Sequence, residues 1–110
     1  MRKFSLDAQV REHLRQAAAA SNGRSAQTVY GGHEQALRQT LIALTAQTVL
    51  SDHENPGEAT LLVLRGRVRL TCREDAWEAM AGDLLVMPHD RHGVEALEDS
   101  AVLLTVTKRR

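Results

Sequence analysis

One segment carries a row of closely spaced arginines, namely Arg65, Arg67, Arg69 and Arg73. A second basic run follows at residues 108–110. Nucleic acids and anionic membranes attract an excess of positive charge, and single strands also stack on aromatic side chains. Here 14 basic residues are balanced by 14 acidic ones, and only 3% of the residues are aromatic. We therefore expect no nucleic-acid or membrane partner. We expect instead a solvated face on which the arginines pair with the nearby acidic residues Glu74, Asp75 and Glu78.

Cys72 and Trp77 are the other side chains of this segment with distinctive chemistry. Cys72 alternates with Val68 and Leu70, so we expect a small buried hydrophobe rather than a nucleophile. It is the only cysteine and cannot form an internal disulfide, which fits a reducing cytosol. No apolar run approaches the ~20 residues of a spanning helix, so the sequence predicts a cytoplasmic protein. For Trp77, core packing and the lining of a ligand pocket both stay open, with packing favoured.

These side chains must be positioned by one helix followed by many short strands. Ser5 suits the N-cap of a helix over residues 5–21, whose apolar positions recur at steps of three and four residues until Asn22-Gly23. Short runs separated by turn residues then predict strands over 26–30, 37–46, 59–64, 67–72, 76–80, 84–87, 94–97 and 101–107. We therefore expect an all-β domain over residues 26–110, preceded by a helix and linker over residues 1–25.

Two segments of this strand series resemble the two motifs of the cupin family. The first runs from His53 to Gly66 and ends in Val63-Leu64-Arg65-Gly66, where that family has His-x-His, then Glu, then a closing Gly. The second runs from Gly82 through Pro88 to His92, where the family has Gly, Pro-x-Gly and His. The resemblance covers residues 35–108. It implies a double-stranded β-helix, which is a jelly-roll barrel of six to eight strands, with the N-terminal helix packed outside. Small cupins commonly dimerise, so it also implies a homodimer.

The family resemblance further implies a metal site, from which this sequence departs. Cupins bind a divalent first-row metal through histidines and one carboxylate, and His53 and His92 match two of those ligands. The metals that such nitrogen and oxygen ligands suit are Fe, Mn, Ni and Zn. Asn55 replaces the second histidine of the first motif, and Ala59 stands at the Glu position. Glu58 is adjacent, but successive strand residues point to opposite faces, so its carboxylate is expected outside unless the strand bulges.

Three functions stay open at this point. The first is a small-molecule-binding barrel without a firm catalytic role, and its pocket would be lined by His53, Asn55, Leu61, Val63 and His92. The second is a metal-dependent enzyme of the dioxygenase or isomerase type, in which a third ligand joins His53 and His92. The candidates for that ligand are Glu58, His33 and His89. The third is an accessory protein that acts through partners. The residues themselves name neither the ligand nor the reaction.

Overall fold

The computed structural model describes residues 1–53 and 57–107, and for residues 51–53 it describes the backbone alone. Within these residues the chain forms one helix and nine strands. The helix is α1 (Leu6–Ala19). The strands are β1 (Arg24–Tyr30), β2 (Leu37–Leu44), β3 (Val49–His53), β4 (Ala59–Arg65), β5 (Arg67–Cys72), β6 (Asp75–Met80), β7 (Leu84–Val86), β8 (His92–Ala96) and β9 (Ser100–Thr107). No helix in the described ranges is both long and apolar enough to cross a membrane.

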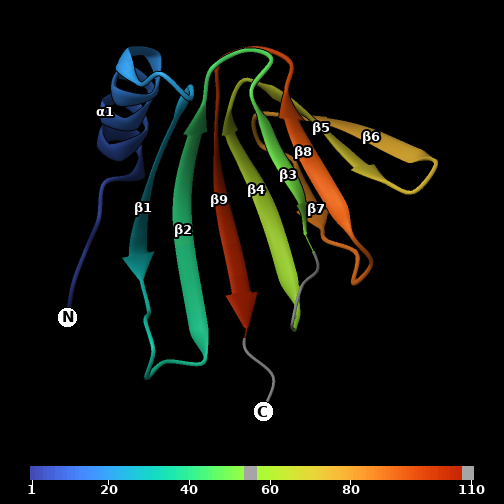
Figure 1. Ribbon diagram of the computed structural model, residues 1–110. Coiled ribbons are helices and arrows are strands. Elements are labelled where there is room, and N and C mark those ends of the chain that lie inside the picture. Colours follow the sequence, from blue (N-terminus) through green and yellow to red (C-terminus); the bar gives the residue numbers. More distant parts are fainter. Residues whose placement is uncertain (54–56, 108–110) are drawn as a thin grey trace.

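The strands form two antiparallel sheets, which Figure 1 shows as two layers. The larger sheet has the order β1-β2-β9-β4-β7, and the smaller has the order β3-β8-β5-β6. Most neighbours in a sheet are distant in the sequence, since β9 lies between β2 and β4, and β8 lies between β3 and β5. This crossing of the chain between two sheets is the jelly-roll arrangement that the sequence predicts. The described residues contain one strand more than the expected upper limit of eight.

Apolar side chains on the facing sides of the two sheets form the core. In β4, Ala59, Leu61 and Val63 are buried while the residues between them are half-buried. In β5, Val68 and Leu70 are buried, which confirms the predicted alternation, whereas Cys72 is half-buried rather than buried as expected. Burying a leucine or valine side chain fully stabilises the fold by roughly 1.5–3 kcal/mol. The alternating strands of the sequence therefore supply the main stabilising term.

The helix α1 covers the outer face of the larger sheet, next to β1 (Figure 1). Val10 is buried against Leu41 of β2 and Ala101 of β9. Ser5 caps the helix as predicted, because its Oγ accepts a hydrogen bond from the Ala8 N–H at 3.2 Å. The outer surface of the barrel thus holds a second, smaller apolar cluster beneath the helix.

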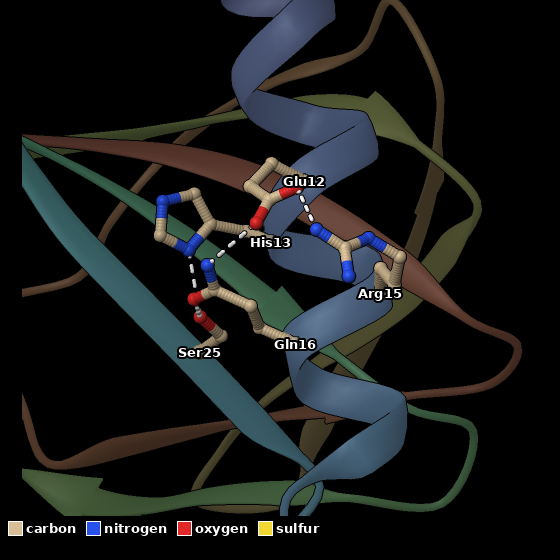
Figure 2. A network of polar contacts seen from close by, with 5 residues as sticks. All are labelled: Glu12, His13, Arg15, Gln16 and Ser25. Carbon is tan, nitrogen blue, oxygen red and sulfur yellow. Dashed lines mark hydrogen bonds and ion pairs between the residues drawn. The ribbon is translucent and has the colours of Figure 1, made fainter.

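His13 marks the polar side of this contact, between α1 and β1 (Figure 2). Its side chain is buried, with Nδ1 2.6 Å from Ser25 Oγ and Nε2 2.8 Å from Gln27 Oε1. The Ser25 hydroxyl donates to Gln16 Oε1 at 2.9 Å, and the Gln16 amide donates to Glu12 Oε1 at 2.9 Å. A buried imidazole must find hydrogen-bond partners, and here β1 and α1 supply them. The network therefore ties the helix to the edge strand.

The strand β3 is a feature that the sequence pattern misses. The sequence predicts one strand over 37–46 and none over 49–53, whereas β2 ends at Leu44 and the chain turns back into β3. Gln47 takes a positive φ of 73° in this turn, and its N–H donates to the Ala96 carbonyl at 2.7 Å. Val49 is exposed, and a short strand with Ser, Asp and His carries little periodic signal. Pairing with β8 defines this strand more than its own composition does.

Candidate functional site

His92, the first residue of β8, is 1% exposed. Its Nδ1 lies 2.9 Å from the carbonyl oxygen of Asp90. A carbonyl oxygen can only accept, so Nδ1 donates the hydrogen bond, and in the tautomer that this selects the lone pair is on Nε2. The β3–β8 pairing places His53 opposite His92. The structure thus brings the backbones of the two predicted histidines together, while Asn55 lies outside the described residues.

The strand pairings of the smaller sheet continue the row of opposed residues from His53 and His92 to β5 and β6. Cys72 of β5 lies opposite His92, and Asp75 of β6 lies opposite Cys72. In the next row, Leu70 lies opposite Trp77. Residues directly opposite each other in an antiparallel pair share a face. Because Leu70 belongs to the core, the side chains of Asp75 and Trp77 are on the inner face of the β5–β6 hairpin.

A cavity of about 580 Å³ opens between this hairpin and β7, the last strand of the larger sheet. The hairpin lies at the opposite end of the molecule from α1 (Figure 1). We call this the edge cavity, and it is lined by Leu70, Cys72, Arg73, Asp75, Trp77, Leu84, Leu85, Val86, Pro88 and Asp90. Leu70 and Leu85 belong to the core, but Trp77, Leu84 and Val86 are 66%, 60% and 79% exposed. The cavity therefore joins a buried apolar floor to apolar walls that remain in water.

Among the described residues, three with charged side chains line the edge cavity. Arg73 Nη2 lies 3.1 Å from Asp90 Oδ2, so these two form an ion pair. Asp75 takes part in none of the ion pairs that the described residues form. The described lining of the cavity therefore has one guanidinium and two carboxylates, and the Asp75 carboxylate is the one that forms no ion pair with the described residues.

The three candidates for a third metal ligand lie outside the lining of the edge cavity. Ala59 is buried in the core, so its neighbour Glu58 is exposed on the outer side of the larger sheet, as strand alternation predicts. Glu58 and His89 line a second cavity of about 340 Å³, together with Ala59, Thr60, Val86, Met87, Thr105 and Thr107. His33 is exposed between β1 and β2. None of Glu58, His89 and His33 is among the residues that line the edge cavity.

The pocket predicted from the sequence is only partly described. Leu61 and Val63 face the barrel interior, but at 1% and 0% exposure they form part of the closed core. Neither residue, nor His92, lines the edge cavity or the second cavity. Asn55 and the side chain of His53 lie outside the described residues. A pocket that contains all five residues therefore stays a prediction.

The described donors do not by themselves fit the metal that the resemblance implies. No group of three or more His, Cys, Asp and Glu side chains is placed to hold a metal ion in the part of the chain whose side chains are described, which leaves out residues 51–56. His92 supplies one imidazole, Ala59 has no donor atom, and Glu58 lies on the outer side. Transition-metal sites in proteins use three or four converging ligands. One buried imidazole falls short of that set.

Of the four arginines in the row, Arg67 and Arg69 lie on the outer face of the smaller sheet. Arg65 instead ends β4 of the larger sheet, and Arg73 lines the edge cavity. Arg67 and Arg69 lie 3.7 and 3.6 Å from the Glu78 carboxylate, and Arg69 lies 3.8 Å from Glu95. The predicted pairing is confirmed for Glu78, whereas Asp75 lines the edge cavity on the inner face instead and Glu95 is a partner that the sequence did not indicate. Exposed pairs of this kind stabilise a protein by about 0–1 kcal/mol each.

The site residues that the sequence misses are Asp75 and Asp90. The Arg73-Glu74 turn sets the register of the β5–β6 hairpin, and this register places Asp75 opposite Cys72. Counting outward from that turn would have put Asp75 and Trp77 on the face of Cys72. No local signal shows that β7 comes to lie opposite them, because β7 belongs to the other sheet.

Solved structures with this fold cover most of the chain. A conserved protein of unknown function from Streptococcus pyogenes is 25% identical with a TM-score of 0.73, and the match covers 83% of this chain and 79% of that one. An RmlC-like cupin from Desulfovibrio desulfuricans is 25% identical with a TM-score of 0.68, covering 76% and 81%. KdgF from Halomonas sp. is 24% identical with a TM-score of 0.68, covering 79% and 82%. No protein-family model and no curated protein sequence matches the chain.

The two motif segments run along the strands of both sheets. The first leads through β4 into the turn at Gly66, and the second leads from Gly82 through β7 to His92 at the start of β8. Two antiparallel sheets with crossed connections enclose one apolar core. Together with the RmlC-like neighbours, these features establish the fold. The chain therefore has the cupin fold and is similar to small RmlC-like cupins.

Proposed function

We propose that this cupin binds a small molecule with an apolar body in the edge cavity. The observation that carries the proposal is the cavity itself, whose volume of about 580 Å³ falls within the ~300–1,000 Å³ of typical ligand pockets. Leu70 and Leu85 give it a rigid floor because both are packed in the core. A preformed apolar floor with a few polar groups at the rim is the usual construction of a ligand site.

The exposed apolar walls support the same proposal. Trp77, Leu84 and Val86 leave large side-chain surfaces in water. Removing apolar surface from water stabilises a complex by roughly 25 cal/mol per Å². A ligand seated between the hairpin and β7 would shield surface from both sheets at once. Burial of these walls would therefore supply the main driving force for binding.

The edge cavity also adjoins the cupin histidine. Cys72 lines the cavity and lies opposite His92 in the β5–β8 pairing. Asp90 also lines the cavity, and its carbonyl oxygen accepts a hydrogen bond from His92 Nδ1. An occupant would thus contact residues that orient His92, which links the cavity to the motif segment.

The chain carries its own probes for this binding. Trp77 is the only tryptophan and Cys72 the only cysteine, and both line the cavity. We expect 4-phenyl-1-butanol to change the Trp77 emission saturably, with excitation where the phenyl group does not absorb. The same ligand should slow alkylation of the Cys72 thiol by iodoacetamide over the same concentration range. If neither probe responds saturably, the proposed function is wrong.

Two variants of β6 sharpen this test. Trp77→Ala removes the aromatic wall and should weaken binding by about tenfold, measured by protection of Cys72. Met80→Ala lies on the same strand but outside the cavity lining, and it should leave the affinity unchanged. Equal losses in both variants would point to a general effect on the hairpin rather than to a contact with the ligand.

A metal-dependent enzyme of the dioxygenase or isomerase type is the second candidate. It is favoured by the orientation of His92, whose lone pair is on Nε2, and by the register that places His53 opposite. Metal analysis of protein purified without a histidine tag tests it. Stoichiometric Fe, Mn, Ni or Zn that is lost in both His53→Ala and His92→Ala would establish a metal site. A protein that takes up none of these metals after incubation would exclude this candidate.

A further inference from the structure

We propose that the occupant of the edge cavity is an organic cation, with an apolar, preferably aromatic body and a protonated amine. This inference rests on the proposed binding function and adds the charge of the ligand to it. The juxtaposition that carries it is the Asp75 carboxylate beside the Trp77 indole, in a cavity whose single guanidinium is already paired.

Asp75 and Trp77 border the same part of the edge cavity. They are two residues apart on β6, so their side chains leave the same face of the strand at a spacing of about 7 Å. Their register partners, Cys72 and Leu70, line the same cavity. A group that enters between the hairpin and β7 therefore meets a carboxylate and an aromatic ring together.

The charges of the cavity lining favour a cation over an anion. Arg73 is the single cation among the described lining residues, and its guanidinium is engaged by Asp90 at 3.1 Å. An anionic ligand would have to displace Asp90, whose carbonyl also holds His92, and it would face the charge of Asp75. A cationic ligand would break no existing ion pair and would neutralise Asp75.

Trp77 adds to this preference. The negative face of an indole attracts a cation that lies within about 6 Å of the ring centroid, and tryptophan does so more strongly than tyrosine or phenylalanine. The indole is 66% exposed, so its surface is open to an incoming group. An amine can thus pair with the carboxylate while its apolar body lies against the ring and the leucine side chains.

A matched ligand series tests the charge. The ligands 4-phenylbutylamine, 4-phenyl-1-butanol and 4-phenylbutyrate share one body and differ in the charge of the head group. We expect the amine to bind about three- to tenfold more tightly than the alcohol, and the butyrate more weakly than either, by Trp77 emission and Cys72 protection. Added salt should reduce the advantage of the amine, because a half-exposed pair is screened.

A pair of charge-removing variants assigns the effect to one residue. Asp75→Asn should bring the affinity ratio of amine to alcohol close to one. Glu74→Gln removes the same charge from the neighbouring turn residue, which does not line the cavity, and should keep the ratio. If the alcohol binds but the amine binds no better, or if both variants lose the preference equally, the cation proposal is overturned while the binding function stands. If the alcohol does not bind, the binding function itself fails.

Discussion

At the scale of single residues, Gly66 constrains the passage of the chain from one sheet to the other. It lies between the end of β4 and the start of β5 with a φ of 86°. A Cβ at this position would meet the Ser100 Oγ and the Asp99 carbonyl. Ser100 is 0% exposed, and its Oγ accepts the Arg67 N–H at 3.0 Å, so it cannot move aside without losing a buried hydrogen bond.

Gly66→Ala should therefore lower the free energy of unfolding by about 3 kcal/mol, from backbone strain and the contact with Ser100 together. Gly82→Ala is the matched control, because Gly82 has a similar φ of 95° but open space around its Cβ. We expect that variant to cost about 1 kcal/mol, from strain alone. Urea denaturation measures both. Equal losses would show that the contact with Ser100 contributes nothing.

At the scale of elements, α1 is held to the outside of the barrel by a small contact. Val10 is its buried anchor against Leu41 and Ala101, while the network around His13 fixes its polar side. The Ser5 cap satisfies one N–H of the first turn. A helix of this length depends on tertiary packing rather than on its intrinsic propensity.

Val10→Ala should accordingly lower the free energy of unfolding by about 1–3 kcal/mol, because it leaves a cavity between the helix and the sheet. Arg11→Ala on the exposed side of the same helix should change it by less than about 0.5 kcal/mol. Urea denaturation followed by far-ultraviolet circular dichroism gives both values. A Val10 variant as stable as the Arg11 variant would mean that the helix docks without this anchor.

An element can be predicted from the sequence when its own residues, rather than distant strands, determine its structure. The helix and strands such as β4 and β5 carry clear periodicity, so the sequence predicts them to within a few residues. The strand β3 has no such pattern and takes its place from pairing with β8. The same holds for the site. His92 is a prediction from its motif, whereas Asp75 and Trp77 come to line one cavity only because β7 of the other sheet lies opposite them.

At the scale of the whole molecule, the exposed edges of the larger sheet favour association of two copies. The edge strand β7 exposes Leu84 and Val86 beside unpaired backbone groups, and β1 forms the other edge. The formal net charge of +0 removes long-range repulsion between copies. We therefore expect a homodimer that pairs through β7.

Leu84→Lys should shift this homodimer toward monomer in sedimentation equilibrium, because a charge on the edge strand disfavours strand pairing. Tyr30→Lys places the same charge on β1 and should leave the dimer intact. Both are measured without ligand, since Leu84 also lines the edge cavity. A wild-type chain that stays monomeric, or a dimer broken only by Tyr30→Lys, would contradict pairing through β7.

The hydrogen bonds of the His13 network between α1 and β1 also run in a fixed direction from donor to acceptor. Hydrogen bonds from Arg15 and then Gln16 hold the pKa of Glu12 below its usual value, so this carboxylate accepts until the pH falls through that lowered pKa. Because Glu12 accepts from the Gln16 amide nitrogen, the Gln16 oxygen faces Ser25 and accepts a hydrogen bond from its hydroxyl. Because the Ser25 hydroxyl has donated its hydrogen to Gln16, it can only accept a hydrogen bond from His13 Nδ1. A half-buried acid on the helix surface thus sets the direction of the hydrogen bonds that reach one nitrogen of a buried histidine.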